Sequence, residues 1–325
     1  MNHNGDRELG MRQVRAAANT GAQAVKFQSF DANELADASA PLADYQTRSS
    51  TGEQRAMLAK LELTDADFAA YLQEGERLGV VVFSTPFDPR SVERLAKAGT
   101  KLMKVPSGEI TNFDLLRAIA RTGLPTIIST GMSELDEVRH AVEVHRAARG
   151  GPLALLHCVS SYPAPLEQMN LRAIETLRRE FELPIGLSDH SIGPAAAIAA
   201  VALGAVVVEK HFTVDRTLTG PDHAMSTEPA EFGDLVDTLR KLRVGLGTGE
   251  KRAMPAELEV RDVARRSVFV ARAIRAGSAI AREDLVAKRP GGGIGPDRMD
   301  SLVGKRAKRD LTEGEMIRFE DVANL

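Results

Sequence analysis

The chain has 325 residues, of which 43% are hydrophobic and 27% charged, as in an ordinary globular protein. A net charge of −3 argues against a broad nucleic-acid-binding surface, and the single cysteine, Cys158, cannot form an intrachain disulfide, so a reducing compartment is expected. The longest apolar stretch, Ala195–Val208, is shorter than the ~20 residues that span a bilayer and no signal peptide is recognisable, so we expect a cytoplasmic protein that binds neither membrane nor nucleic acid.

Short β-rich runs alternate with helix-like segments from residue 24 to residue 213. The expected strands are Ala24–Phe30, Val80–Phe87, Leu102–Ser107, Pro125–Thr130, Leu153–Val159, Pro184–His190 and Val206–Thr213. The expected helices are Arg7–Thr20, Thr64–Leu78, Ser91–Ala98, Asn112–Thr122, Glu134–Ala148, Leu171–Glu182 and one within Ser191–Leu203. Thr64 with Asp67, and Ser133 with Glu137, are candidate N-caps. This alternation predicts an α/β fold with a parallel sheet covered by helices.

The short, evenly recurring strands favour a closed (β/α)₈ TIM barrel over an open doubly wound sheet. No glycine-rich dinucleotide fingerprint follows the first strand, which weakens the alternative. Only seven strands can be counted, whereas such a barrel needs eight. The chain opens with a polar loop, Met1–Gly5, followed directly by a helix, which has the form of a βα unit without its strand. We therefore expect either a misplaced start codon or the loss of the first strand.

The pattern changes after the barrel-like region, which gives three expected parts: a barrel domain over 1–244, a linker over 245–266 and a small β-rich domain over 267–325. The small domain contains an internal repeat. Ile274–Gly277 is echoed by Leu311–Gly314 at an offset of 37, and Glu283–Leu285 is echoed by Glu320–Val322 at the same offset. Such a repeat suggests a pseudo-twofold duplication of a short β unit, with the glycines in turns. The loop Lys288–Gly295 between the copies should be exposed and could reach a neighbouring cleft.

The last two strands of the barrel region end in histidines that can share one cation. Because side chains alternate along a strand, Ser188 and His190 lie on one face, as do Glu209 and His211. A right-handed crossover places the two strands side by side, ~4.8 Å apart. Two neutral imidazoles suit Mn²⁺, Zn²⁺ or a similar ion with open positions, which implies Lewis-acid chemistry on a carbonyl. Alternation sends Lys210 to the opposite face, which the sequence does not explain; a β-bulge is one way to turn it.

The other strands of the barrel region also end in polar residues. These ends are Lys26–Gln28, Ser84–Thr85, Lys104–Glu109, Ser129–Met132 and His157–Tyr162. Two lysines and several Ser-Gly or Ser-Thr-Gly turns supply the charges, hydroxyl donors and backbone N–H groups that bind a phosphate. A metal beside such a pocket suggests a phosphorylated carbon nucleophile meeting an aldehyde. Taken singly, each feature has an ordinary interpretation, as a solvated lysine, a turn or a hydrogen-bonded core histidine, so the inference depends on their coincidence.

Together these motifs resemble those of the sialic acid synthase family. The matching segments are Asn2–Gly5, Val25–Gln28, Ser84–Phe87, Lys104–Glu109, Ser129–Met132, His157–Pro163, Gly186–His190, Glu209–Thr213, Gly220–His223 and Lys288–Pro290. Their order and spacing match from residue 2 to the C-terminus, so the resemblance covers nearly the whole chain. It implies a (β/α)₈ barrel followed by a small antifreeze-like (SAF, β-clip) domain. It also implies condensation of phosphoenolpyruvate with an N-acetylhexosamine aldehyde, N-acetylmannosamine or a 2,4-diacetamido relative, to a nine-carbon sialic acid and phosphate.

The resemblance also implies roles for individual residues. His190 and His211 would hold the metal, Mn²⁺ with Mg²⁺ or Co²⁺ as alternatives, and would serve catalysis together with Glu209 and Lys104. The residues implied to contact phosphoenolpyruvate are Lys26, Lys104, Ser107, Ser129, Ser160 and Ser188. Those implied on the sugar side are Gln28, Thr85, Tyr162, Glu209, Asp222 and Arg289. Arg289 would reach the N-acyl group of the sugar in the partner subunit of a domain-swapped homodimer.

One departure from the family pattern leaves alternatives open. The family places a catalytic glutamate on the first strand, just before the Asn-His-Asn-Gly loop, and this chain starts after that position. If the first strand is truly absent, a catalytically inactive sugar- or phosphate-binding protein is the alternative. A metal-dependent aldolase that does not use phosphoenolpyruvate is a third interpretation, against which Lys104, Ser129 and the C-terminal domain argue. Legionaminic and pseudaminic acid synthases share these motifs, so the sugar stays open within the synthase class.

Overall fold

The computed structural model describes residues 1–42, 47 and 53–323. The chain forms two compact units, Met1–Gly247 and Thr248–Leu325. The first unit ends just after α10 (Pro229–Leu246), slightly beyond the boundary expected at residue 244. The segment 245–266, expected as a linker, contains the short helix α11 (Leu258–Ala264), which lies within the second unit.

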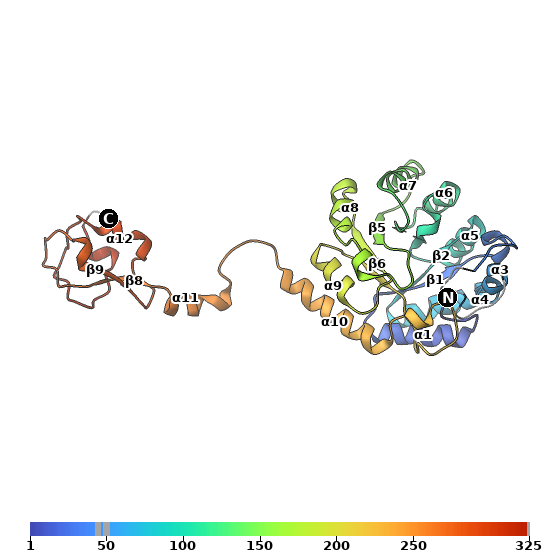
Figure 1. Cartoon of the computed structure of the whole chain (residues 1–325), viewed down its shortest axis with the longest axis horizontal. Helices are drawn as coiled ribbons and strands as arrows, with labels where there is room; N and C mark the ends of the chain where they lie inside the picture. The colour runs from blue at the N-terminus through green and yellow to red at the C-terminus, as the bar shows by residue number, and fades with distance from the viewer. Residues whose placement is uncertain (43–46, 48–52, 324–325) are drawn as a thin grey trace. The chain divides into compact units, whose positions relative to one another are not determined.

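The first unit contains a parallel sheet of seven strands in the order β1 to β7, in which each strand pairs with the next along the chain. The strands are β1 (Ala24–Ser29), β2 (Val81–Pro86), β3 (Met103–Val105), β4 (Thr126–Ser129), β5 (Leu153–Cys158), β6 (Ile185–Asp189) and β7 (Val208–Lys210). The sheet curls into a TIM-like partial barrel with the helices along its outside (Figure 1). All seven strands expected from the sequence are therefore confirmed. Within the described residues, β1 and β7 are the edge strands of the sheet.

The helices of the first unit follow the predicted alternation. They are α1 (Arg7–Asn19), α2 (Ala32–Leu35), α3 (Gln54–Ala59), α4 (Asp65–Leu78), α5 (Pro89–Ala98), α6 (Phe113–Arg121), α7 (Leu135–Ala147), α8 (Ala173–Phe181), α9 (Ala195–Ala202) and α10. The Thr64 N-cap of α4 is confirmed, because its hydroxyl accepts the Asp67 N–H at 3.1 Å. The Ser133 N-cap is wrong: α7 is capped at Glu134, whose N–H donates to the Glu137 carboxylate at 2.8 Å, and the Ser133 hydroxyl donates to the Gly131 carbonyl.

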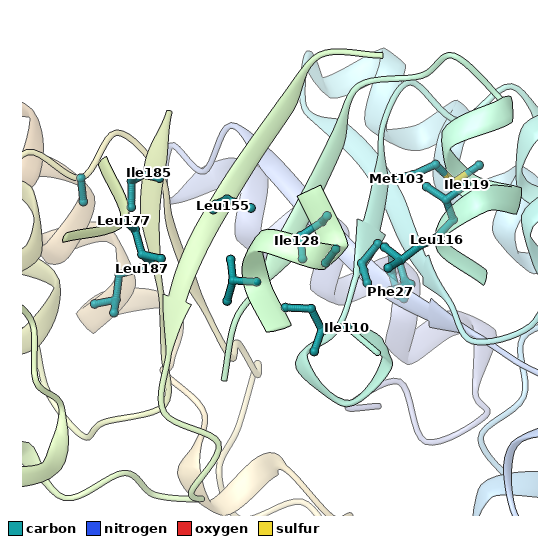
Figure 2. Packing of buried hydrophobic residues seen from close by; sticks show 14 of the residues in the cluster. Phe27, Met103, Ile110, Leu116, Ile119, Ile128, Leu155, Leu177, Ile185 and Leu187 are labelled. Carbon is teal, nitrogen blue, oxygen red and sulfur yellow. The ribbon is translucent and has the colours of Figure 1, made fainter. Parts of the chain in front are cut away.

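The core of the first unit lies between the outer face of the sheet and the helices. Phe27 of β1 stacks on Tyr71 of α4, with ring centroids 4.6 Å apart. Figure 2 shows Leu116 of α6 beside the sheet. It also shows Leu177 of α8 beside Leu187 of β6. Leu116 and Leu187 are fully buried. Truncating a side chain of this kind to alanine costs about 2–5 kcal/mol, so this layer supplies much of the free energy that holds the sheet in its curl.

Alternation along each strand then decides which side chains face the interior of the barrel. Since Phe27 packs outward, Lys26 and Gln28 face inward. Lys104 lies between two buried apolar neighbours on β3 and likewise faces inward. In the last two strands Ser188 is in register with Glu209. The regular register places polar side chains from successive strands on one inner surface.

The second unit carries the internal repeat. Its strands β8 (Ser267–Val270) and β9 (Leu285–Lys288) pair antiparallel, and its helical segments are α11, α12 (Met299–Leu302) and short 3₁₀ turns. Ile274 and Leu311, equivalent in the two copies, bond reciprocally through their backbones at 2.9 and 2.8 Å. Gly277 and Gly314 both have positive φ, which confirms the predicted duplication and the role of the glycines in turns. No helix in the described part of the chain is both long and apolar enough to span a membrane.

Candidate active site

A cavity of about 350 Å³ lies on the inner surface of the curled sheet, at the strand ends. It brings together every predicted site residue of the first unit except Thr85. These are Lys26, Gln28, Lys104, Ser107, Ser129, Ser160, Tyr162, Ser188, His190, Glu209, His211 and Asp222. They come from β1, β3, β4, β6 and β7 and from the loops that follow β3, β5, β6 and β7. The sheet therefore converges side chains from distant parts of the sequence on one volume.

Glu209 is at the centre of the charged groups. Its carboxylate lies 3.4 Å from the Lys104 ammonium and 3.8 Å from that of Lys26, and it accepts a hydrogen bond from the Ser188 hydroxyl at 3.2 Å. Lys104 is almost fully buried and also donates to the Ser129 hydroxyl at 2.6 Å. Two cations thus flank one anion at the inner end of the cavity.

Burial and charge shift the pKa of these groups in opposite directions. Burial alone would raise the pKa of Glu209, but Lys104, Lys26 and the two histidines outweigh it and lower that pKa to about 2. Burial lowers the pKa of Lys104, against the attraction of Glu209. Glu209 is therefore a carboxylate in the resting site.

Hydroxyl groups and a backbone N–H lie around the C-terminal end of β4. The Gly131 N–H donates to the Ser107 hydroxyl at 3.0 Å. A Cβ on Gly131 would lie 2.4 Å from the Ser160 hydroxyl oxygen and 2.9 Å from that of Ser107, so only glycine allows the two serines to approach this loop. These donors lie on the same cavity wall as Lys104 and Ser129, which makes this wall suitable for an anion.

The two predicted metal ligands face each other across the cavity. The His190 and His211 rings have centroids 5.3 Å apart and are inclined by 60°. The Tyr162 ring lies 4.3 Å from that of His190 and 5.9 Å from that of His211. The two imidazoles therefore contact each other directly, with Tyr162 beside both.

The hydrogen-bond partners of these rings leave one nitrogen of each available. His190 Nδ1 donates to the Val159 carbonyl at 2.9 Å, and His211 Nδ1 lies 3.6 Å from the Asp222 carboxylate. Partners of this kind on Nδ1 orient an imidazole for metal binding through Nε2. Burial lowers the pKa of His211 to about 4, so this ring is neutral, the form that binds a metal. The donor set thus fits a divalent ion held by two imidazoles.

No group of three histidine, cysteine, aspartate or glutamate side chains able to hold a metal occurs among the residues that the structure describes. A metal bound by His190 and His211 would therefore have open coordination positions for water and substrate, the arrangement of catalytic rather than structural sites.

Two predicted site residues lie apart from the cavity. Thr85 is fully buried in β2, and its hydroxyl has no hydrogen-bond partner. Arg289 belongs to the second unit, where it is exposed in the loop after β9. That loop is anchored at its far end by Ile294, which is buried and accepts the Val268 N–H at 2.8 Å.

Three residues that support the site were not predicted from the sequence. The Asn2 amide donates to the Phe212 carbonyl and to the Ser226 hydroxyl, each at 2.8 Å, and so holds the segment after β7. His223 is completely buried and bonds to the Thr213 hydroxyl at 2.7 Å, next to Asp222. Cys158 lies between Ser160 and His190, 3.8 Å from each. Asn2 and His223 belong to recognised motifs, but nothing in their spacing shows which groups they contact.

Comparisons with known proteins cover both units of the chain. Residues 13–251 match the model of the NeuB family, and residues 265–323 match that of the SAF domain. N,N'-diacetyllegionaminic acid synthase from Legionella pneumophila is 42% identical over 99% of this chain and 92% of its own length. Human N-acetylneuraminate-9-phosphate synthase is 32% identical over 99% of this chain and 90% of its own length. The crystal structure of N-acetylneuraminic acid (sialic acid) synthetase from Leptospira borgpetersenii, in complex with citrate, superposes with a TM-score of 0.71 at 36% identity. It covers 80% of this chain and 86% of that one.

Proposed function

Because this chain belongs to the NeuB family of sialic-acid-like synthases, we propose that it condenses phosphoenolpyruvate with the open-chain aldehyde of an N-acetylhexosamine. The products are a nine-carbon sugar acid of the sialic acid type and inorganic phosphate. The observation that carries this proposal is the cavity in which Lys26 and Lys104 flank Glu209 beside the imidazoles of His190 and His211.

The lysine wall of the cavity suits phosphoenolpyruvate, which carries a phosphate and a carboxylate. Lys104 and Lys26 supply point charges, while Ser107, Ser129 and Ser160 supply hydroxyl donors on the same wall. Ser188, bonded to Glu209, completes the set at the end of β6. Burial of Lys104 strengthens its interaction with an anion, because water screens the charges less.

Other lining residues of the cavity suit the sugar aldehyde. Gln28, Tyr162 and Asp222 offer hydrogen bonds to hydroxyl groups. A divalent ion bound by His190 and His211 would supply Lewis-acid polarisation of the aldehyde oxygen. We place Mn²⁺ there, with Mg²⁺ or Co²⁺ as alternatives.

The reaction forms a bond from C3 of phosphoenolpyruvate to the aldehyde carbon, and water then adds at C2. The resulting tetrahedral intermediate expels phosphate by cleavage of its C–O bond, and the phosphate leaves with the electron pair. Glu209, a carboxylate in the resting site, accepts a hydrogen bond from the attacking water and so orients it. The proton that this water gives up is balanced by the one that the aldehyde oxygen takes up as it becomes a hydroxyl. Lys104 and Lys26 stabilise the negative charge that builds on the departing phosphate.

Two further assignments complete the proposal. Arg289 reaches the N-acyl group of the sugar in the partner subunit of a domain-swapped homodimer, which its exposed, glycine-rich loop supports. Of the relatives compared, the more similar one is named for a product with two N-acetyl groups, which favours a 2,4-diacetamido aldehyde over N-acetylmannosamine.

Phosphate release on mixing the full chain with phosphoenolpyruvate, Mn²⁺ and each candidate aldehyde tests the proposal. We expect release that requires the aldehyde and that is faster with the 2,4-diacetamido sugar. Binding of phosphoenolpyruvate without release would instead support an inactive sugar- or phosphate-binding protein. A new C–C bond without phosphate release would support an aldolase. His190→Ala and His211→Ala should each abolish release while the circular dichroism spectrum stays unchanged.

A further inference from the structure

We propose that the buried ion pair between Asp189 and Lys210, called the clamp below, is a positioning device for the two metal-binding imidazoles. This inference rests on the metal site of the proposed function. It also explains why a lysine lies on the outer face of β7, where the sequence offered no reason for one. The register of β6 and β7 is regular through this pair, so no bulge turns Lys210.

The clamp joins the last residues of two neighbouring strands. Asp189 ends β6, Lys210 ends β7, and the two are direct register partners. The Lys210 ammonium lies 2.8 Å from Asp189 Oδ2, with side-chain exposures of 5% and 0%. Such low exposure distinguishes the clamp from the ion pairs on the surface of the same unit.

Every strong hydrogen-bonding group of the clamp is directed at the residues that flank His190. The Lys210 ammonium also donates to the Ser191 carbonyl at 2.7 Å. Asp189 Oδ1 accepts from the Ser191 N–H at 2.8 Å and from its hydroxyl at 2.7 Å. One ammonium therefore holds the residues immediately before and after His190, and Lys210 itself is bonded through the backbone to His211. The clamp thus ties together the backbone that carries both imidazoles.

Stability alone is a poor reason for this arrangement. Removing two charges from water costs several kcal/mol per ion, and well-packed apolar residues in their place are often neutral or stabilising. The best-attested benefit of a buried ion pair is that it specifies one arrangement of the chain.

The strand β7 has a particular need for such specification. It is only three residues long, and within the described residues β6 is its only partner. A slip of one residue would send Lys210 into the cavity and turn His211 toward the helices, because side chains alternate. The slip would also leave Asp189 buried without its cation, which is strongly unfavourable. The clamp therefore selects the register in which His190 and His211 face each other.

The test measures Mn²⁺ affinity of the full chain directly, from the electron paramagnetic resonance signal of free Mn²⁺ during titration. The Asp189→Asn/Lys210→Met variant removes both charges and the cross-strand bond, while the asparagine can still accept from Ser191. We expect its Mn²⁺ affinity to fall at least tenfold, the usual effect of losing a group that orients a metal ligand. Calorimetric binding of phosphoenolpyruvate should change within twofold, since Lys26 and Lys104 lie on β1 and β3 and only Ser188 of its proposed contacts lies on β6.

The matched control is Glu74→Gln/Arg77→Met, which removes an ion pair of 2.8 Å on α4 of the same unit, outside the cavity. Its Mn²⁺ affinity should stay within twofold of the wild type. If the clamp variant also stays within twofold, or if the control loses as much, the clamp has no positioning role. Should the clamp variant not fold, Ser191→Ala, which removes a single bond to Asp189, gives the same test: an unchanged Mn²⁺ affinity refutes the clamp.

His190→Ala and His211→Ala distinguish this inference from the proposed function. If both bind Mn²⁺ as the wild type does, the metal assignment is wrong and the clamp has nothing to position. If both lose binding and the clamp variant does not, the metal assignment stands and only the clamp is refuted.

Discussion

The carboxylate of Glu209 lies 3.4 Å from the ammonium of Lys104, although their strands, β7 and β3, are not neighbours in the sheet. The contact exists because the sheet curls until the inner faces of distant strands oppose each other. It neutralises a buried cation and at the same time keeps Glu209 ionised, with a pKa of about 2. The first prediction follows from this double role.

Replacing Glu209 with glutamine should separate substrate binding from turnover. Without the carboxylate, Lys26 and Lys104 attract an anion more strongly, so the KM for phosphoenolpyruvate should fall. If Glu209 orients the attacking water, kcat should fall by about 10²-fold. Steady-state phosphate release gives both constants. A raised KM with an unchanged kcat would show that Glu209 only positions substrate.

Replacing Gly131 with alanine should damage the anion-binding wall. The new Cβ would lie 2.4 Å from the Ser160 hydroxyl oxygen and 2.9 Å from that of Ser107, so at least one serine must move. We expect the KM for phosphoenolpyruvate to rise at least tenfold. Gly108 lines the same cavity and is the control, because a Cβ there meets nothing within 4 Å. Gly108→Ala should keep a KM within about twofold of the wild type, and equal effects of the two substitutions would contradict the assignment of this wall.

The ionised carboxylate of Glu74 should stabilise the first unit at neutral pH, and this stabilisation should disappear in strong acid. Hydrogen bonds from Arg77 and Arg15 lower the pKa of this carboxyl to about 2, below its ordinary value of 4.5. A lowered folded-state pKa means that the stabilisation is fully present above about pH 4.5 and is lost as the pH falls toward 2. Glu74→Gln should therefore lower the free energy of unfolding at pH 7, and the difference from the wild type should shrink as the pH falls.

Urea unfolding at several pH values from 7 to 2.5 measures this difference. The matched control is Asp114→Asn, which removes a carboxylate whose side chain is 92% exposed in a surface ion pair. That variant should unfold as the wild type does at neutral pH. A Glu74→Gln deficit that stayed constant across the whole pH range would mean that the carboxylate charge is not its cause.

The duplication in the second unit makes equivalent positions energetically equivalent. Ile274 and Leu311 are both buried and bond to each other through their backbones. Truncating either to alanine should destabilise this unit by about 2–5 kcal/mol, and the double variant should be non-additive because the two residues adjoin. Val303→Ala is the control, since Val303 is 41% exposed. Urea unfolding of the full chain measures all four proteins, and a large effect at only one of the two repeat positions would show that the copies are not equivalent.

Local regularities made much of this molecule predictable. Short β-rich runs between helix-like segments predicted the seven strands, and side-chain alternation predicted that Ser188 shares a face with His190 and Glu209 with His211. The equal spacing of Ile274–Gly277 and Leu311–Gly314 gave the duplication. These features depend on neighbours within a few residues or on a repeated segment, so the chain shows them without its fold. The predicted Ser133 N-cap was wrong, because Ser133 and Glu134 are adjacent and spacing alone does not decide which of them caps α7.

The sequence by itself thus determined the succession of strands along the chain and which residues share a face at the ends of the last two strands. Only the tertiary structure decided which of those residues meet, because the curl of the sheet sums small rotations between all its strands. That curl brings Glu209 to Lys104, buries the Thr85 hydroxyl outside the cavity, and pairs Lys210 with Asp189 behind the two imidazoles. Contacts between residues far apart in the chain have no signature in local periodicity, and they are what make this set of polar strand ends a single site.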